Sequence, residues 1–263
     1  MNVSLNKLEM EARKSSVIHN LDARIKLIMT LIIIVYSVLT SNILILILLE
    51  SYIIILTFFS KLSLSYYFKR VLYILPFGGF IAIFQPFILS GTILYTLPFG
   101  ININYEGIIF AVLLLTRLLV CISMIVLFSS STPMNNIISS LRSLGFPKIL
   151  AMILSMTVRY LFVFFDELEN IRNAQKSRCF NIWNRKAKYL WTLKQIGYTI
   201  MMIFLNSFEK GEKIYFSMIS RGYVGETVSY IKEPPMMRIN YCILILTLLL
   251  IVLLEIAKPF IIL

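Results

Sequence analysis

The chain has 263 residues, of which 59% are hydrophobic and 14% charged, and its mean hydropathy is +0.84. Soluble domains are apolar at roughly half of their positions, so this composition excludes an ordinary water-soluble fold. The long apolar runs lack the alternating pattern of barrel strands. We therefore predict an all-α fold, that of a polytopic helical membrane protein.

Five apolar runs are predicted to span the bilayer as helices. They cover residues 27–40, 43–59, about 71–89, about 107–128 and about 239–257. A hydrocarbon core roughly 30 Å thick needs about 20 helical residues, so the first two runs rely on flanking residues. Pro76 and Pro86 interrupt the third run, with a Gly-Gly pair between them. We expect a kinked or partly unwound helix there, packed inside protein.

The basic residues predict the orientation. Fifteen of the 25 lysines and arginines lie in residues 131–238, whereas the turn at 41–42 and the loop 90–106 contain none. By the positive-inside rule, the N-terminus and residues 131–238 are cytoplasmic. The net charge of +12 then reflects topology and an anionic lipid leaflet, and we expect no nucleic-acid partner. Five spans would place the C-terminus outside, although Lys258 disagrees, so its side stays open.

This pattern divides the chain into four parts. They are a cytoplasmic N-terminal segment (1–26), a four-helix transmembrane region (27–130), a cytoplasmic region of coupling helices (131–238) and a C-terminal transmembrane helix (239–263). In the third part we expect a short amphipathic helix up to 144 and long helices over 148–176 and about 193–220. Their apolar halves, 149–165 and 196–208, are either membrane-proximal helices or a transmembrane hairpin. The basic residues between 172 and 194 favour the first alternative.

No pattern of catalytic or metal-binding residues is evident. The three cysteines (Cys121, Cys179 and Cys242) are scattered, and His19 is the single histidine. We therefore expect no metal site, no cofactor and no enzymatic activity in this chain. A membrane-embedded enzyme is the weaker alternative, because Glu50 and Arg117 are the only plausible catalytic polar residues within the predicted spans. We expect Arg117 to join helices, with Glu50 as its possible charge partner.

One short pattern occurs twice in the polar region. Residues 177–180, Ser-Arg-Cys-Phe, and 220–223, Ser-Arg-Gly-Tyr, lie 43 residues apart and each follows a predicted helix. Acidic residues precede the two arginines at matching distances. Asp166 and Glu209 lie twelve residues before them, and Glu169 and Glu212 lie nine residues before them. A guanidinium group suits a rigid contact to carboxylates or carbonyls. Simple charge complements of the helix C-termini are the alternative, but the repeat favours a partner present in two copies.

The two repeats are expected to differ in backbone shape. Gly222 suits the left-handed position that ends many helices, whereas Cys179 suits it less well. We therefore expect the end at Arg178 to be stiffer or more distorted than the end at Arg221. Arg159 and Asp166 share a helix face and are interpreted as a structural network at the membrane surface.

Several of these motifs resemble those of one transporter family. Residues 220–226, Ser-Arg-Gly-Tyr-Val-Gly-Glu, resemble the second arginine signature of the transmembrane T components of energy-coupling factor (ECF) transporters. Residues 144–147, 157–162 and 174–178 resemble the approach to the first signature, and residues 20–27 resemble the family's entry segment. The segments around 159–162 and 221–226 are most similar to the cobalt-type branch, CbiQ. The chain departs from the family pattern at Cys179, commonly glycine, and at Ser177 and Ser220, commonly alanine.

The resemblance implies a non-catalytic T subunit of an ATP-driven importer, most similar to those for cobalt. It implies two CbiO-like ATPase subunits that bind ATP and Mg, and a CbiM-like substrate-binding membrane subunit, with a CbiN-like accessory in some systems. The residues implied to contact the ATPases are Ser177, Arg178, Cys179, Ser220, Arg221 and Gly222. Those implied as supporting helix contacts are Arg159, Asp166, Glu169, Glu209 and Glu212. A T component for nickel or vitamins, and a membrane scaffold without a transport role, are the alternatives.

Overall fold

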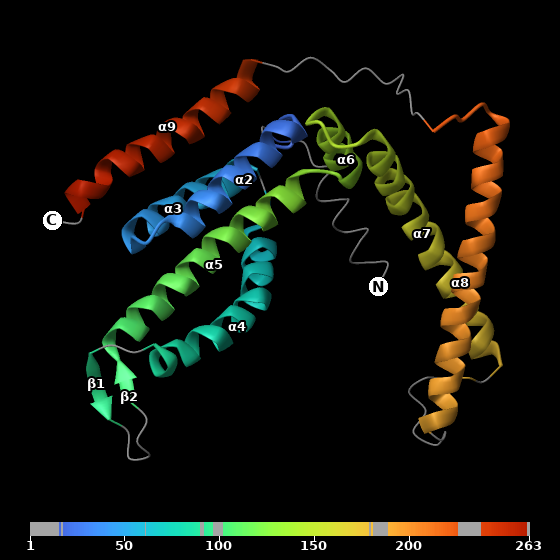
Figure 1. Cartoon of the computed structure of the whole chain (residues 1–263), viewed down its shortest axis with the longest axis horizontal. Helices are drawn as coiled ribbons and strands as arrows, with labels where there is room; N and C mark the ends of the chain where they lie inside the picture. Colours follow the sequence, from blue (N-terminus) through green and yellow to red (C-terminus); the bar gives the residue numbers. More distant parts are fainter. Residues whose placement is uncertain are drawn as a thin grey trace. The chain divides into compact units, whose positions relative to one another are not determined.

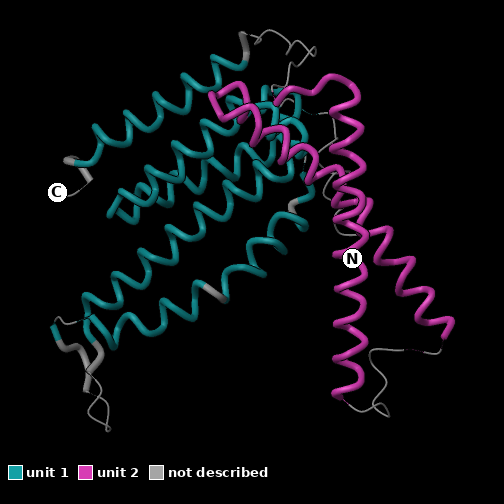
Figure 2. The backbone as a smooth tube through the Cα atoms, turned by 45° about the vertical axis from the view of Figure 1, so that its right-hand side comes forward, with its two compact units in different colours: residues 1, 3–140, 234–263 teal, residues 2, 141–233 magenta. Residues whose placement is uncertain are grey.

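The structure, a computed structural model, describes residues 16, 18–60, 62–89, 92–96, 102–178, 180, 189–225 and 238–261. Its contacts divide the chain into two compact units (Figure 2). The first unit contains residues 3–140 and 234–263, and the second contains residues 141–233. Both units are built mainly from helices, which confirms the predicted all-α class.

The first unit contains a helix at each of the five predicted spans. These helices are α2 (Ala23–Leu39), α3 (Ile43–Phe59), α4 (Leu64–Ile88), α5 (Tyr105–Ser131) and α9 (Arg238–Ile261). Helices α4, α5 and α9 are long and apolar enough to cross a membrane, and α3 is a shorter apolar helix. Helix α5 contacts α2, α3 and α4, while α9 contacts α2 (Figure 1). The chain is therefore a polytopic helical membrane protein with α5 central to its first unit.

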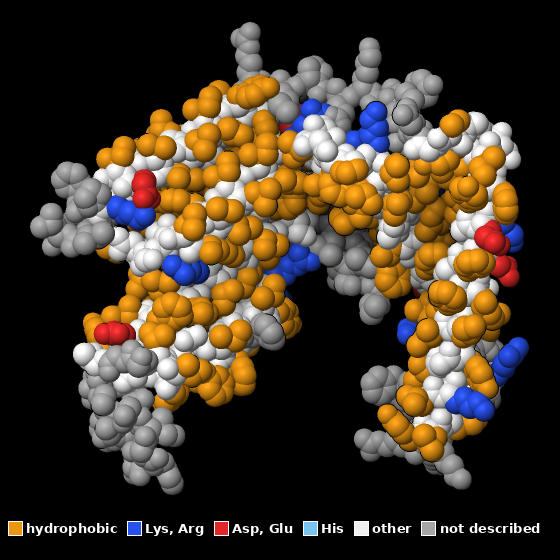
Figure 3. Space-filling model, in the orientation of Figure 1, with side chains coloured by type: hydrophobic (Ala, Val, Ile, Leu, Met, Phe, Trp, Pro, Cys, Tyr) orange, Lys and Arg blue, Asp and Glu red, His pale blue; other side chains and the backbone are white. Residues whose placement is uncertain are grey.

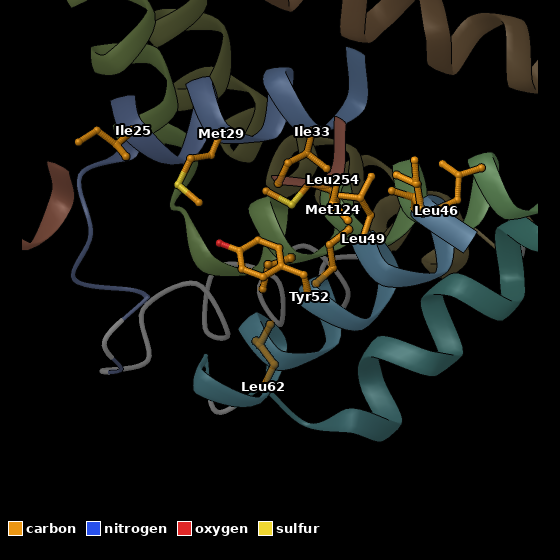
Figure 4. Packing of buried hydrophobic residues seen from close by; sticks show 13 residues of the cluster. Ile25, Met29, Ile33, Leu46, Leu49, Tyr52, Leu62, Met124 and Leu254 are labelled. Atoms are coloured by element: carbon orange, nitrogen blue, oxygen red, sulfur yellow. The ribbon is translucent and has the colours of Figure 1, made fainter. Parts of the chain in front are cut away.

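The core of this unit lies where α2, α3, α5 and α9 meet. Ile33 of α2, Leu49 of α3 and Val120 of α5 are almost fully buried, and Leu254 of α9 packs against the same cluster (Figure 4). The outward faces are also apolar, since Leu39 is 74% exposed, and hydrophobic side chains cover much of the surface (Figure 3). An apolar exterior around an apolar core is expected for helices that face lipid.

Helix α4 contains both prolines of the predicted kinked span. Pro76 and Pro86 lie inside one continuous helix, which bends along its length (Figure 1). The helix is therefore kinked as predicted but not unwound, in keeping with the missing amide donors of proline. Near its end, a Cβ atom on Gly107 of α5 would lie 2.6 Å from Pro86 Cα. The absence of a side chain at Gly107 allows this close approach of α4 and α5.

The predicted outer loop contains a short β-hairpin that the sequence did not indicate. Strand β1 (Ile93–Thr96) pairs with strand β2 (Asn102–Asn104) in antiparallel orientation. The side-chain amide of Asn104 donates a hydrogen bond to the backbone carbonyl of Leu89. The hairpin is thereby attached to the end of α4.

Glu50 and Arg117, expected as possible charge partners, do not pair with each other. Arg117 donates hydrogen bonds from Nε and Nη2 to the Thr40 carbonyl, at 3.1 and 2.8 Å. Glu50 Oε1 accepts bonds from Ser123 Oγ at 2.7 Å and from Tyr67 Oη at 3.3 Å. Both charged side chains thus join helices, as expected for Arg117, but each through neutral partners. The Arg117 guanidinium satisfies a carbonyl at the C-terminus of α2, where free acceptors lie.

A buried lysine lies at the start of α2, just before the predicted first span. Lys26 is 6% exposed, and its Nζ donates hydrogen bonds to the carbonyls of His19 at 3.2 Å and Ser131 at 3.0 Å. One turn earlier, Asp22 Oδ2 accepts a bond from Asn240 Nδ2 of α9 at 3.1 Å. Burial lowers the pKa of Lys26 to about 8, opposed by the nearby Asp22 carboxylate. These contacts join the start of α2 to the end of α5 and the start of α9.

The second unit consists mainly of two long helices. Helix α6 (Met134–Ser143) reaches across the unit boundary and is followed by α7 (Lys148–Ser177) and α8 (Tyr189–Ser220). Gly145, with a φ of +97°, lies between α6 and α7, which end and begin within one residue of the predicted positions 144 and 148. Helix α8 begins four residues before the predicted start. Helix α7 is long and apolar enough to cross a membrane, so its length and composition admit either location.

Candidate functional site: two arginine-bearing helix ends

Helix α8 ends in a tight turn around the second arginine motif. The N–H groups of Arg221 and Tyr223 both donate to the Met218 carbonyl, at 3.1 and 3.0 Å, and Gly222 N donates to Ile219 O at 2.9 Å. Gly222 has a φ of +81°, which confirms the predicted left-handed position. This hydrogen-bond pattern is the Schellman motif, which satisfies the free carbonyls at a helix C-terminus.

Helix α7 ends with equivalent hydrogen bonds at the first motif. Arg178 N and Phe180 N both donate to the Gln175 carbonyl, at 3.1 and 3.0 Å. Cys179 itself lies outside the described residues. At each end, the N–H groups of the arginine and of the residue two positions later share one carbonyl three residues before the arginine. These hydrogen bonds therefore show no difference between the two ends, and the predicted difference in backbone shape depends on Cys179.

The serine before each arginine also makes the same contact. Ser177 Oγ donates to Asn173 O at 3.1 Å, and Ser220 Oγ donates to Phe216 O at 2.9 Å. Both hydroxyl groups therefore bind their own helix one turn back. The side chains of Arg178 and Arg221 are exposed. Each helix end consequently presents a guanidinium group with donors in a planar fork, suited to carboxylates or carbonyls of a partner.

An aromatic residue follows each arginine by two positions. The Phe180 ring packs edge-on against Trp191 of α8, with ring centroids 5.5 Å apart. Tyr223 lies beside the groove between α7 and α8. Both aromatic residues belong to the repeated four-residue motifs, at 177–180 and 220–223. Their equal distance from the arginines was the signal that could have identified them.

Helices α7 and α8 cross each other in both views (Figures 1 and 2). At the crossing, Lys210 Nζ lies 2.9 Å from Glu167 Oε2, and Asn206 Nδ2 donates to Glu167 Oε1 at 3.1 Å. Further along, Gln175 Nε2 donates to Thr199 Oγ1 at 2.6 Å. The direction of these pairs shows that the two helices run antiparallel. Glu167 was not among the predicted site residues, although Lys210 follows it by the same 43 residues that separate the arginines.

The acidic residues that the sequence singled out lie elsewhere on these helices. Asp166, Glu169, Glu209 and Glu212 are exposed. Arg159 and Asp166 form no hydrogen bond or ion pair with each other, and the Arg159 guanidinium instead lies 5.9 Å from the Tyr160 ring centroid. The two side chains therefore do not bond each other directly, and the interpretation of Arg159 and Asp166 as a structural network at the membrane surface stays a prediction. A supporting role for the acidic residues stays a prediction.

An open apolar groove of about 760 Å³ lies between α7 and α8. Its lining includes Met156, Phe164, Met218 and Tyr223. Its lining side chains are largely hydrocarbon, so the groove offers few groups for proton transfer or metal binding. Throughout the described ranges, no three His, Cys, Asp or Glu side chains lie close enough together to hold a metal ion.

Comparison with known proteins identifies the family. The family model described as "Cobalt transport protein" (CbiQ) matches residues 14–230. An uncharacterised protein of Methanocaldococcus jannaschii is 33% identical over 230 residues, which cover 86% of this chain and 77% of that protein. The energy-coupling factor transporter transmembrane protein EcfT of Lactococcus lactis is 28% identical over 219 residues, covering 80% and 81% of the two chains.

A third relative is a fusion protein. The putative fused cobalt transport protein CbiMQ of Methanocorpusculum labreanum is 30% identical over 128 residues, which cover 48% of this chain and 20% of that protein. The family match covers both arginine motifs and, of the helices that the structure describes, all except α9. The chain therefore belongs to the cobalt transport protein (CbiQ) family and is a transmembrane T component of an ECF transporter.

Proposed function

We propose that this chain couples two cytoplasmic ATPase subunits to a substrate-binding membrane subunit, and that the transported ion is cobalt. In this proposal the chain is not catalytic, and ATP and Mg are bound by the ATPases, which are CbiO-like. The N-terminus and the second unit face the cytoplasm, as the distribution of basic residues favours.

The matched arginine ends are the observation that carries the proposal. Arg178 and Arg221 are both exposed, and each is presented by a helix end closed through equivalent backbone and serine hydrogen bonds. Two equivalent cationic ends on one subunit suit a partner that is present in two copies. Closure of the ATPases on nucleotide would then move both ends and, through them, the membrane helices.

Support for cobalt comes from the family's description and from the fused relative named as a cobalt transport protein. By the same argument the substrate-binding subunit is CbiM-like, with or without a CbiN-like accessory. A T component that serves nickel or vitamins is the second candidate, because the EcfT relatives' names specify no substrate. Uptake of radiolabelled cobalt, nickel and vitamins by cells expressing the complete transporter would distinguish the two.

The coupling role is tested by reversing the charge of each arginine. We expect Arg178→Glu and Arg221→Glu each to reduce co-purification of the ATPases or to separate ATP hydrolysis from uptake, because a carboxylate cannot donate the hydrogen bonds of a guanidinium. Arg172→Glu is a matched control, since Arg172 is exposed on the same helix but lies outside the motif. Full assembly and full uptake with both reversals would show that these helix ends are not the coupling contacts.

A scaffold without a transport role is the alternative from another class. It predicts that ATP hydrolysis by the assembled complex does not depend on this chain. Vanadate-sensitive hydrolysis that requires the chain, together with two ATPase copies per complex, would exclude it.

A further inference from the structure

Glu167 and Lys210 occupy equivalent positions in α7 and α8, and they contact each other. Each lies eleven residues before the arginine of its own helix. Their side chains form an ion pair with an Nζ–Oε2 distance of 2.9 Å. When two equivalent residues of a repeat touch, the two-fold axis that relates the repeats passes close to them. The crossing of α7 and α8 therefore has local pseudo-two-fold symmetry.

Positions on either side of the ion pair are related by the same symmetry. On one side, Gln175 bonds Thr199. In the 43-residue repeat, the position equivalent to Gln175 is Met218 and the position equivalent to Thr199 is Met156. Both methionines line the groove on the other side of the ion pair. The two sides of the crossing thus use equivalent positions with different chemistry, polar on one side and apolar on the other.

One face of each helix is partly buried at positions that the 43-residue repeat relates. Seven equivalent pairs of positions are partly buried on both helices, each spaced at helical intervals along one face. They are Met152 and Gln195, Met156 and Thr199, Tyr160 and Ile203, Phe164 and Ser207, Glu167 and Lys210, Ile171 and Ile214, and Gln175 and Met218. Each helix therefore presents the same face to the crossing.

Because of this symmetry, the two arginine ends lie at equal distances along their helices from the ion pair. Eleven helical residues rise about 16 Å, so Arg178 and Arg221 lie at the same distance along their helices from the ion pair. A change in the crossing angle would move both ends by equal amounts. A partner with two equivalent binding sites requires such equal spacing.

We infer that Glu167 and Lys210 are positioning residues that set the crossing of α7 and α8 and hence the separation of the arginine ends. Both oxygens of the Glu167 carboxylate are bound by α8, one by Lys210 and the other by Asn206. Lys210 Nζ also lies 5.8 Å from the Phe164 ring centroid on α7. The ion pair is about one-third exposed on both sides, with 35% and 30% of the side chains accessible. Such pairs contribute little to stability, so geometry is the stronger role.

The inference rests on the proposed coupling function, but its test can be read without the ATPases. Spin labels at Ala174→Cys and Ser217→Cys, which are exposed and equivalent positions, would report the separation of the helix ends. The three native cysteines are first replaced. Distances are measured on the full chain in lipid nanodiscs, alone and with the ATPases. Glu167→Lys and Lys210→Glu should each shift and broaden the distance distribution, because they place like charges at the crossing.

The charge exchange separates positioning from a general loss of structure. The double variant Glu167→Lys with Lys210→Glu restores the pair and should restore both the distance distribution and the uptake per ATP hydrolysed. Lys213→Glu, at an exposed lysine three residues further along α8, should change neither. Unchanged distances in the single variants, or no recovery in the double variant, would overturn the inference. Loss of ATPase binding on reversal of Arg178 or Arg221 would leave the coupling function standing in that case.

Discussion

Gly222 shows how far one residue determines a helix end in this protein. Its φ of +81° lies in the region that side chains with a Cβ atom disfavour, and it allows the turn that presents Arg221. The equivalent end at Arg178 is closed by matching hydrogen bonds even though the following residue is Cys179. The sequence predicted the left-handed glycine. The predicted difference in backbone shape at the other end depends on Cys179, which lies outside the described residues, and it stays a prediction.

Two glycine-to-alanine substitutions, one just after the end of α8 and one within it, should therefore have opposite effects. Gly222→Ala should weaken the hydrogen bond from Tyr223 N to Met218 O by about 1 to 2 kcal/mol, the cost of a Cβ atom at positive φ. Gly211→Ala lies within the helix, where its Cβ would meet nothing within 4 Å, and should stabilise α8 by up to about 1 kcal/mol. Amide hydrogen exchange of the full chain would measure both, and slower exchange at Tyr223 in Gly222→Ala would contradict the assignment.

Single polar contacts join helices that are distant in sequence. Lys26 bonds the carbonyl of Ser131, where α5 ends and the chain continues toward the second unit. Asp22 bonds Asn240, where the chain returns into α9. The start of α2 therefore contacts both places in the first unit where the chain leaves toward residues 141–233 and returns from them.

Loss of the Lys26 ammonium group should destabilise the first unit. Lys26→Met retains an apolar side chain but leaves the buried carbonyl of Ser131 without its donor, at a cost of about 1 to 3 kcal/mol. Thermal unfolding in detergent would measure this, and Lys69→Met, at an exposed lysine of α4, is the control. Equal melting temperatures for the two variants would show that the Lys26 contacts are not stabilising.

The stability difference should also depend on pH. The pKa of Lys26 is about 8 in the folded protein, below the ordinary lysine value of 10.5, so between these values the folded chain binds fewer protons than the unfolded chain. Stability contributed by wild-type Lys26 therefore rises as the pH increases from about 8 to 10.5, and methionine lacks this effect. The advantage of wild type over Lys26→Met should widen over that range.

At the scale of the whole molecule, the length of α7 allows a transmembrane topology, whereas the distribution of basic residues favours a cytoplasmic one. Helix α7 is long and apolar enough to cross a membrane. The basic residues that surround it favour a cytoplasmic location for both of its ends. The two alternatives place the C-terminal half of α7 on opposite sides of the membrane.

Cysteine labelling at two exposed positions would separate these alternatives. In a chain with its native cysteines replaced, we expect Ser41→Cys to react with a membrane-impermeant maleimide added to intact cells. We expect Asn173→Cys to react only after the membrane is opened, because α7 is proposed to be cytoplasmic. Reaction of Asn173→Cys in intact cells would instead support a transmembrane hairpin of α7 and α8.

Much of the helical layout follows from local sequence patterns. The apolar runs indicated five helices of the first unit, and the predicted bounds at 144 and 148 match the end of α6 and the start of α7 within one residue. These features depend on neighbouring residues along the chain, which is why the sequence predicts them. The β-hairpin between α4 and α5 was missed, because its two strands are short and its pairing is not a local property.

By itself, the sequence determined the membrane class, the helices and the two arginine motifs, because hydrophobicity and helix-ending residues act over a few turns. Only the tertiary structure decided which polar side chains meet. It separated Glu50 from Arg117, placed Lys26 against the end of α5, and selected Glu167 rather than Asp166 for the crossing. Neighbouring residues on a helix point about 100° apart, so the choice between two adjacent carboxylates depends on how the second helix crosses the first.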